Sequence, residues 1–422
     1  FLEVLFGAMH AGLVPVMINA KLPAAQVQYI VADSGAVMGF ADTQFRALCA
    51  PDTRIVEFGP AGGGEYGEFK HPGRFESYAP SFEDIAEQPY TSGSTGRPKG
   101  VMMNHSQNLR LYEEWCELAD LREGDRYLMV NPYFHTFGYK AGLIASFIRG
   151  ATMLPVPVFD VGRVVDLIAA EQITMLPGPP TLYHSLLAVA DKSKLASLRA
   201  GVTGAADIPV ELVRRVHEEL PFRTLATGYG LTEAGTVTLS RPGDSFEDIA
   251  TTAGVACDGV EVRIADDGEV LVRGYTVMQG YLDDPEATAQ TIDSDGWLHT
   301  GDLGTLDAAG RLRIVGRKKD MFIVGGFNAY PAEIEGFLLE HPAVAQAAVI
   351  GVPDERLGQV GKAFLVTKTT DGSPPPSADE MIAWSRDRMA GFKVPRYVEF
   401  LDELPLNATG KVMKDKLEGH RR

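Results

Sequence analysis

The amino-acid sequence predicts an α/β fold with a large N-terminal domain and a small C-terminal domain, and three observations support this. Helices and short apolar strands alternate over roughly the first 250 residues, which is typical of parallel α/β sheets. From about Thr251 the pattern changes to short strands joined by tight turns. After the basic run that ends at Lys319, a mixed pattern of helices and strands begins again. We therefore predict a large domain of parallel α/β sheets at residues 1–317, with a β-rich subdomain at about 251–317, and a small α+β domain at 318–422.

Composition limits the classes of function. The chain has 422 residues, of which 45% are hydrophobic, so it can bury large cores. Its formal charge of −17 disfavours nucleic acid as a general partner. The three cysteines have no paired spacing, which argues against a disulfide framework or a zinc site and favours a reducing, cytoplasmic location. No apolar run reaches the length of a membrane span.

The first 80 residues predict a β–α–β arrangement. Phe1 opens an amphipathic helix without a cap, and the helix should run to about Gly12, so we expect the native N-terminus to lie upstream. Residues 50–80 are rich in glycine and proline, and we expect them to be irregular. Between these parts we expect a strand at Val14–Ile18 and a helix at Pro23–Ser34. A second strand, parallel to the first, is expected at Gly35–Phe40.

The stretch Tyr90–Gly100 combines hydroxyls, glycines and two cations. Glycine lets backbone N–H groups face an anion, hydroxyls donate to phosphate oxygens, and a lysine adds positive charge. The stretch therefore predicts a polyphosphate-binding loop, and a flexible linker is the alternative. It is not a Walker loop, because Pro98 precedes Lys99 and a glycine follows it. The residues expected to contact phosphate are Thr91, Ser92, Gly93, Ser94, Thr95, Gly96 and Lys99.

After this loop, helices and strands alternate as in a parallel sheet. A helix at about Ser106–Ala119 should bury Leu109, Tyr112 and Trp115 on one face. The next expected elements are Tyr127–Asn131, Thr152–Pro157, Val164–Glu171, Ile173–Leu176, Pro180–Ala190, Leu198–Val202, Pro209–Leu220 and Arg223–Ala226. The stretches that follow four of the strands contain His135, the Pro-Gly-Pro-Pro run, Gly204 and Gly228. Because ligands bind beyond the carboxyl ends of parallel strands, we expect these four loops to converge on one crevice.

The elements beyond residue 251 are short. An Asp-Asp-Gly turn between Val260–Ile264 and Glu269–Val272 predicts a β-hairpin, and Arg311–Val315 follows a similar turn. In the small domain we expect strands at Met321–Val324, Val344–Gly351 and Lys362–Thr367 and helices at Pro331–Glu340 and Ala378–Met389.

Six motifs occur in one order along the chain, and they begin at Thr91, Gly228, Thr300, Gly316, Tyr330 and Leu406. They are Thr-Ser-Gly-Ser-Thr-Gly-Arg-Pro-Lys-Gly, Gly-Tyr-Gly-Leu-Thr-Glu, Thr-Gly-Asp-Leu-Gly, Gly-Arg-Lys-Lys-Asp, Tyr-Pro-Ala-Glu-Ile-Glu and Leu-Asn-Ala-Thr-Gly-Lys. By these motifs the chain resembles the adenylate-forming superfamily of acyl-CoA synthetases, luciferases and adenylation domains, from about Phe1 to Leu417. The run Phe134–Lys140 is most similar to actinobacterial fatty-acyl-CoA synthetase-like acid–CoA ligases.

The resemblance implies a reaction in two steps. A carboxylate attacks the α-phosphorus of ATP and releases pyrophosphate, and a thiol then attacks the acyl-adenylate. The implied cofactors and co-substrates are ATP, Mg²⁺ and coenzyme A. Because two anions must meet in the first step, catalysis should consist mainly of neutralising charge and positioning the reactants.

The resemblance also implies roles in the nucleotide site. Thr232 would meet the α-phosphate, and Glu233 would hold Mg²⁺, which prefers hard oxygen ligands. A solvated acid at a helix start is the alternative for Glu233. Tyr229 would stack on adenine, or else be a core residue. Asp302, expected in a tight Gly-Asp-Leu-Gly turn, would accept both ribose hydroxyls beside Arg317, or else only stabilise the turn. The residues that would leave room for the base are Gly204, Ala205 and Ala206, and Gly228 is a further expected nucleotide-binding residue.

The small domain is implied to be mobile and to serve both steps. Lys411 would reach the carboxylate and the α-phosphate in the first step, although a lysine near a C-terminus is by default a surface residue. Rotation about a hinge at Lys319 would then withdraw Lys411 and bring Gly326 and Phe327, on the CoA side, to the thiol tunnel. An ordinary turn glycine is the alternative for Gly326.

His135 lies among aromatic residues and matches the family's gate to the acyl pocket, with a hydrogen-bonded core histidine as the alternative. The stretch Phe134–Gly138 contains no Asp, which disfavours an amino-acid substrate. Small and apolar residues form the expected pocket walls, so we predict an apolar acid, either fatty or bulky, alicyclic and steroid-derived. One departure from the family is Glu87–Pro89, which breaks the apolar strand that usually precedes the phosphate loop.

Three functions are compatible with these residues. An AMP-forming acid–CoA ligase is favoured, and an adenylating enzyme that transfers the acyl group to a carrier-protein phosphopantetheine thiol is the second. A non-enzymatic nucleotide-binding module is disfavoured, because Lys411, Glu233 and Asp302 are all present. The expected partners are a carboxylic acid, ATP and CoA, and a homodimer is left open.

Overall fold

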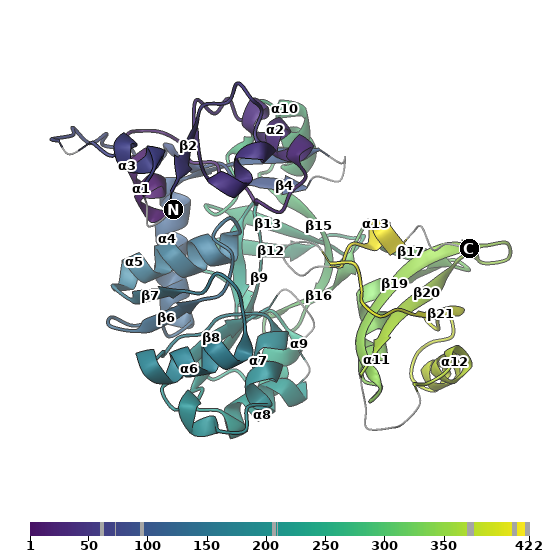
Figure 1. The fold of residues 1–422 in the computed structure, drawn as a ribbon. Coiled ribbons are helices and arrows are strands. Elements are labelled where there is room, and N and C mark those ends of the chain that lie inside the picture. The colour runs from purple at the N-terminus through teal and green to yellow at the C-terminus, as the bar shows by residue number, and fades with distance from the viewer. Residues whose placement is uncertain are drawn as a thin grey trace. The chain divides into compact units, whose positions relative to one another are not determined.

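A computed structural model describes residues 1–59, 63–71, 73–92, 97–204, 208, 210–368, 375–406 and 412–417. The chain forms two compact units (Figure 1). Unit 1 comprises Phe1–Val262 and Val272–Leu298, and unit 2 comprises Arg263–Leu271 and His299–Arg422. The boundary predicted at 317/318 lies inside unit 2, and it stays a prediction about which part of the chain moves.

The N-terminal part of unit 1 contains a small parallel pair of strands. Its elements are α1 (Leu2–His10), α2 (Ala24–Asp33), β1 (Gly39–Asp42), the 3₁₀ helix η1 (Thr43–Leu48), β2 (Ile55–Phe58) and α3 (Glu65–Phe69). Strands β1 and β2 are parallel. The prediction that residues 50–80 are irregular was therefore wrong in part, and β1 begins at Gly39 rather than Gly35.

The predicted strand Val14–Ile18 is absent from the described residues. The Gln88 N–H donates to the Pro15 carbonyl at 3.2 Å, but no ladder continues from this contact. Proline carries no backbone N–H, so the segment cannot return the second hydrogen bond at that position.

The predicted phosphate loop joins two strands. Its elements are β3 (Ile85–Glu87), β4 (Tyr90–Ser92), β5 (Pro98–Asn104) and β14 (Gly280–Tyr281), and the sheet order is β14-β5-β3 with β4 also paired to β5. Thr91 is opposite Lys99 in the antiparallel β4–β5 pair, while residues 93–96 between them lie outside the described residues. Strand β14 pairs antiparallel with β5, with Tyr281 opposite Val101. A segment distant in sequence is thereby held beside the loop.

Helix α4 (His105–Leu118) follows β5 directly. A capping box between Asn104 and Gln107 fixes its first turn. Tyr112 and Trp115 are buried, as predicted, but Leu109 is 46% exposed. The buried residues follow a stripe through positions 107, 108, 111, 112, 115 and 116, and Leu109 lies outside that stripe.

The centre of unit 1 is a parallel sheet with helices packed against it. Strand β6 (Arg126–Met129) is parallel to β7 (Thr152–Pro155), and β8 (Ala200–Thr203) is parallel to β9 (Thr224–Leu231). Met175 bridges both Tyr127 and Ala200, so the two pairs are linked through it. The predicted strand Ile173–Leu176 is thus reduced to one bridge residue. The helices of this part are α5 (Ala145–Arg149), α6 (Val161–Glu171), α7 (Pro180–Leu187), α8 (Val210–Glu219), the π-helix η3 (Phe137–Ile144) and the 3₁₀ helix η4 (Lys192–Leu195).

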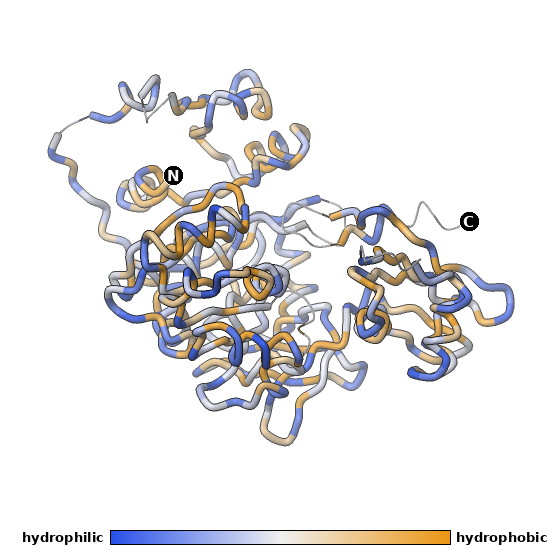
Figure 2. The backbone as a smooth tube through the Cα atoms, turned by 60° about the horizontal axis from the view of Figure 1, so that its bottom comes forward, coloured by the Kyte–Doolittle hydropathy of each residue, from blue (hydrophilic) through white to orange (hydrophobic). Residues whose placement is uncertain are grey.

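Burial stabilises this arrangement. Ile168, Tyr183, Val213 and Val216 come from three different helices, and each is fully buried in one apolar cluster. Figure 1 shows α6, α7 and α8 lying together over the teal part of the ribbon. In Figure 2 the hydrophilic stretches of the backbone fall mostly at the outer loops.

Strand β9 turns back into β10 (Gly235–Leu239), and β10 pairs with β11 (Val255–Ala256), which continues the sheet in the order β11-β10-β9-β8. Two short helices complete unit 1, α9 (Phe246–Thr251) and α10 (Pro285–Thr291).

The predicted β-rich subdomain is a four-stranded sheet. Its strands are β12 (Val260–Ile264), β13 (Glu269–Gly274), β15 (Leu298–Leu306) and β16 (Leu312–Arg317), in that spatial order. Gly268 has a φ of +87° in the turn between β12 and β13, as the predicted hairpin requires.

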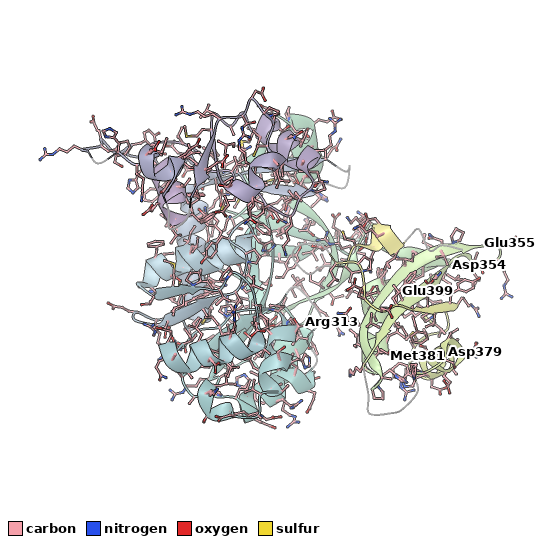
Figure 3. All side chains as sticks on the ribbon, in the orientation of Figure 1. Arg313, Asp354, Glu355, Asp379, Met381 and Glu399 are labelled. Carbon is pink, nitrogen blue, oxygen red and sulfur yellow. The ribbon has the colours of Figure 1, made fainter. Side chains whose placement is uncertain are left out.

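The C-terminal sheet of unit 2 has the order β18-β17-β20-β19, with β21 paired to β20. Its elements are β17 (Phe322–Val324), β18 (Phe327–Ala329), α11 (Pro331–Leu339), β19 (Val344–Asp354), β20 (Gly358–Thr367), α12 (Ala378–Arg386), β21 (Tyr397–Phe400) and α13 (Lys414–Leu417). Ile334, Phe364 and Met381 are fully buried in one cluster, and Figure 3 labels Met381 on α12. Lys362 and Glu399 form an ion pair of 2.9 Å between β20 and β21. The α+β pattern predicted for this region is confirmed.

The described part of the chain contains no helix that is both long and apolar enough to cross a bilayer. Cys49, Cys116 and Cys257 are all free thiols.

Close backbone packing at Gly254 gives a stability prediction. Its φ is +75°, and a Cβ atom there would lie 2.1 Å from the Leu239 carbonyl carbon. Gly124 has a similar φ of +78°, but a Cβ atom there would meet nothing within 4 Å. We expect Gly124→Ala to lower the free energy of unfolding by about 1 kcal/mol, the cost of left-handed backbone alone. Gly254→Ala should lower it by more than about 3 kcal/mol, because backbone must also shift.

Urea unfolding monitored by circular dichroism measures both variants of this pair. Equal losses for Gly254→Ala and Gly124→Ala would show that the strand contact at Gly254 has no energetic weight beyond backbone strain.

Candidate active site

The antiparallel strands β4 and β5, which flank the predicted phosphate loop and are called the phosphate hairpin below, lie close to the predicted Mg²⁺ ligand Glu233 in unit 1. The Thr91 hydroxyl donates to Glu233 Oε1 at 3.5 Å, and the Tyr281 hydroxyl donates to the same oxygen at 3.1 Å. Lys99 Nζ lies 4.9 Å from the centre of the Tyr281 ring. Two separate parts of the sequence, represented by Thr91 and Tyr281, therefore meet at the carboxylate of a third, Glu233.

Glu233 is positioned by backbone hydrogen bonds on both sides. Thr232 and Glu233 form the turn between β9 and β10, and the Ala234 N–H donates to the Leu231 carbonyl at 3.2 Å. The Met278 N–H donates to the Glu233 carbonyl at 2.8 Å. This second bond attaches the turn to the segment that leads directly into β14, the strand that carries Tyr281.

Tyr281 was missed in the sequence. It is 8% exposed, and burial together with the neighbouring Glu233 carboxylate raises the pKa of its hydroxyl. The phenol therefore stays protonated at neutral pH and remains a hydrogen-bond donor. No spacing signal connects it with the loop, because only the pairing of β14 with β5 brings the two together.

The metal prediction can be tested against the donor set. No group of three or more His, Cys, Asp or Glu side chains that could hold a metal ion is found among the described residues. Glu233 offers hard carboxylate oxygens, and the described residues around it offer hydroxyls rather than thiols or imidazoles. Such a site fits Mg²⁺, which is commonly held by one or two carboxylates together with substrate phosphates.

Glycines around Tyr229 are explained by strand packing. A Cβ atom on Gly228 would lie 2.6 Å from the Thr238 carbonyl oxygen, and one on Gly230 would lie 2.4 Å from the Gly235 oxygen. A Cβ atom on Gly204 would lie 3.3 Å from the Gly228 oxygen. Close approach of β9, β10 and the end of β8 thus requires small residues here. Tyr229 is half-buried on β9, while Ala205 and Ala206 lie outside the described residues.

His135 lies in the bend that precedes the π-helix η3. Its Nδ1 accepts a hydrogen bond from the Phe137 N–H at 3.2 Å, and its carbonyl accepts one from the Tyr139 N–H at 2.9 Å. A Cβ atom on Gly138 would lie 2.2 Å from the Pro132 oxygen, so the bend requires glycine at this position. His135 is exposed, which excludes the alternative of a buried core histidine. π-Helices frequently occur at functional sites.

Asp302 and Arg317 meet in unit 2. They are opposite each other in the β15–β16 pair, and Arg317 Nε lies 3.0 Å from Asp302 Oδ1. Asp302 is 5% exposed. The expectation that it occupies a tight turn was wrong, because it belongs to strand β15. The preceding Gly301, with a φ of +70°, provides only a local kink within the strand.

Glu269 is a second residue that was missed. Its carboxylate accepts a hydrogen bond from the Gly301 N–H at 2.9 Å and one from Lys318 Nζ at 3.1 Å, and it lies 3.2 Å from His299 Nδ1. Burial raises the pKa of Glu269, but hydrogen bonds from His299, Gly301 and Lys318 outweigh burial and leave it below its ordinary value. Glu269 therefore stays ionised and links the backbone before Asp302 to Lys318. An acid at the start of an otherwise apolar strand was the available signal.

The predicted residues of the small domain are placed only in part. Lys319 is exposed in the turn after β16. Gly325 and Gly326 have φ values of +58° and +91° in the β17–β18 turn, and a Cβ atom on Gly326 would meet nothing within 4 Å. Phe327 is 61% exposed and stacks on Phe392, with 5.0 Å between ring centres. Lys411, like Gly93, Ser94, Thr95 and Gly96 of the phosphate loop, lies outside the described residues.

Helix α13, which follows the Lys411 motif, is anchored to α11. Lys414 Nζ lies 2.7 Å from Glu335 Oε1, and the same oxygen accepts a hydrogen bond from the Val349 N–H at 2.7 Å. Leu406 and Val412 form an antiparallel bridge. The chain after residue 411 is therefore tied to α11 and, through Glu335, to β19, and the Leu406–Val412 bridge joins the two sides of residues 407–411.

Two family models match the chain, the AMP-binding enzyme over residues 1–282 and the AMP-binding enzyme C-terminal domain over residues 333–411. Two curated relatives are named 3-[(3aS,4S,7aS)-7a-methyl-1,5-dioxo-octahydro-1H-inden-4-yl]propanoyl:CoA ligase. The one from Rhodococcus jostii is 51% identical over 82% of this chain and 67% of its own length. The one from Mycobacterium tuberculosis is 47% identical over 97% of this chain and 84% of its own length.

Solved structures of adenylate-forming enzymes are also similar to this chain over nearly its whole length. ATP-bound MatB from Rhodopseudomonas palustris has a TM-score of 0.91 at 28% identity, covering 100% of this chain and 86% of that one. The o-succinylbenzoate CoA synthetase MenE from Bacillus subtilis, in complex with its acyl-adenylate intermediate, has a TM-score of 0.85 at 29% identity, covering 99% and 85%. The predicted class, an acyl-CoA synthetase that uses ATP, Mg²⁺ and CoA, is confirmed by these relatives. The chain therefore belongs to the family of AMP-binding enzymes, within the adenylate-forming superfamily that its six motifs predicted.

Proposed function

We propose that this AMP-forming acid–CoA ligase acts on a bulky alicyclic carboxylic acid, with a propanoate side chain on a fused-ring ketone as the first candidate. The choice of acid rests on one observation: the chain is 51% and 47% identical in sequence to two ligases whose names specify such a propanoate. The absence of an acidic side chain in Phe134–Gly138 supports it, because no carboxylate there would pair with an ammonium group.

The contacts in unit 1 support a grip on the leaving pyrophosphate. Lys99 supplies positive charge, and Thr91 supplies a hydroxyl donor on the facing strand. Glu233 is negative, so it can share this place with phosphates only if a cation offsets the negative charges, and Mg²⁺ held by Glu233 would supply that positive charge. Tyr281 holds one carboxylate oxygen of Glu233 by a hydrogen bond and so limits the orientation of the carboxylate that would hold Mg²⁺.

The contacts in unit 2 support a ribose clamp. Asp302 is buried and paired with Arg317, so its carboxylate is fixed before any ligand binds. Two ribose hydroxyls can donate to one carboxylate, and Arg317 holds the orientation of that carboxylate. Glu269 fixes the backbone one residue before Asp302 and also holds Lys318, next to the proposed hinge at Lys319.

The first experiment is a panel of carboxylic acids assayed for ATP-dependent consumption of free CoA. We expect the fused-ring propanoate to have the highest kcat/KM, followed by other apolar acids, and amino acids to give no turnover. AMP and acyl-CoA should form in equal amounts. Adenylation without any consumption of free CoA would favour the carrier-protein alternative. A preference for linear fatty acids would overturn the alicyclic assignment but leave the ligase intact.

Lys411→Ala separates the two half-reactions. Because Lys411 would neutralise charge only in the adenylation step, we expect acid-dependent pyrophosphate release to fall by about 100-fold or more. Thioester formation from supplied acyl-adenylate should stay within about threefold of the unchanged enzyme. Lys416→Ala, at an exposed position in the same region, is the control and should alter neither step. Equal loss of both half-reactions would contradict a role confined to the first.

Tyr281→Phe tests the Glu233 arrangement. Losing a hydrogen bond to a charged group costs about 1.5–3 kcal/mol, so kcat/KM for ATP should fall by about tenfold or more and the Mg²⁺ concentration for half-maximal activity should rise. Tyr66→Phe is a matched control, since Tyr66 is also buried and donates to a carboxylate, Glu3, at 2.6 Å. Equal kinetic effects of the two variants would assign the loss to general destabilisation.

A further inference from the structure

A buried ion pair lies outside the residues to which the reaction assigns a role. Lys140 Nζ is 2.6 Å from Glu87 Oε1, and the side chains are 1% and 0% exposed. Burying two charges is costly, and apolar residues of similar volume are often as stable or more so. A general gain in stability therefore does not explain why these two residues stand here.

The pair joins two parts of the proposed site. Glu87 is the last residue of β3 and lies opposite Met103 of β5, the strand that also carries Lys99. Lys140 lies in the middle of the π-helix η3, which begins immediately after the bend that holds His135. The contact therefore links the sheet of the phosphate hairpin to the helix next to the proposed acyl gate. It also explains the polar break at Glu87–Pro89, because a lysine from elsewhere in the chain neutralises Glu87.

Further polar groups surround the pair. Asn108 Nδ2 donates to Glu87 Oε1 at 3.3 Å. Lys140 Nζ lies at ion-pair distance from Glu87 but makes no hydrogen bond of good geometry among the described residues. The Glu87 Oε2, Asn108 Oδ1 and Tyr139 hydroxyl oxygens are likewise buried without a hydrogen-bond partner there. Asn108 and Tyr139 also line a cavity of about 230 Å³, which is large enough for water molecules that could satisfy such groups. A buried ion pair that can form in one geometry only favours one arrangement of the helix over others.

We propose that Glu87 and Lys140 are positioning residues that fix the register of the π-helix, and with it His135 and Gly138, relative to the phosphate hairpin. The effect on catalysis rests on the proposed function, in which His135 and Gly138 border the acid. A π-helix is less favourable than an α-helix and is uncommon at this length, so an interaction from outside has to select it. Lys140 lies within that helix, and Glu87 is its fixed partner on a sheet.

The test compares single and double neutral variants. Lys140→Met alone leaves a buried, unpaired carboxylate, and its Tm should fall sharply. Glu87→Met/Lys140→Met removes both charges and should recover a Tm within a few degrees of the unchanged protein. Hydrogen exchange measured by mass spectrometry should still show faster exchange of residues 137–144 in the double variant, by about tenfold. This readout does not depend on any catalytic assay.

Kinetics provide the second readout. In the double variant we expect KM for the acid to rise by about tenfold while KM for ATP changes less than twofold. The control is Lys362→Met/Glu399→Gln, which removes an ion pair of 2.9 Å in the C-terminal sheet and should change neither residues 137–144 nor KM for the acid.

The outcomes separate the two proposals. Unchanged exchange in residues 137–144 of a stable double variant would overturn the positioning role, whatever the enzyme does. Faster exchange without any change in KM for the acid would confine the pair to helix register and overturn its link to the acyl site. Absence of acid-dependent turnover in the unchanged enzyme would overturn the proposed function, while the exchange measurement would still decide the register.

Discussion

The antiparallel pairing of β14 with β5 is the interaction on which the proposed phosphate site depends. Strand β5 is the second strand of the phosphate hairpin, and β14, which pairs with it, carries Tyr281. The segment before β14 also holds the Glu233 turn, because the Met278 N–H donates to the Glu233 carbonyl. One short strand thus fixes the distance between a cationic loop and an acidic turn, two groups that would otherwise depend on loops to stay in place.

Close backbone packing at glycines fixes the position of β9 relative to its neighbouring strands. Gly228 and Gly230 lie so close to neighbouring backbone that a Cβ atom could not be accommodated at either position. Such contacts leave Tyr229 and the Glu233 turn little freedom, because the strands cannot slide without breaking their register. A glycine-rich motif that is usually explained by space for a ligand therefore has a structural requirement of its own.

Buried charge has a different role in each unit. In unit 2, Glu269 is satisfied by several donors, so it stays ionised and orders the backbone before Asp302. In unit 1, Glu87 and Lys140 neutralise each other with few additional partners. The first arrangement adds local order to a strand, whereas the second joins two elements that share no backbone hydrogen bonds in the described ladders. In both units, the buried charges therefore position neighbouring backbone or helices, and they do not add stability through burial.

Much was determined by the sequence alone. Motif order predicted the family, and the alternation of helices and strands predicted the parallel sheet, because hydrophobic periodicity is a local property. The residue types in Thr91–Lys99 predicted phosphate binding, and the resemblance carried by the six motifs implied the roles of Glu233 and Asp302. What local pattern could not reveal was pairing between distant segments. The strand character of Asp302, the contact of Tyr281 with Glu233, the support of Gly301 by Glu269 and the neutralisation of Glu87 by Lys140 were decided only by the tertiary structure, since each depends on which strand or helix lies next to which.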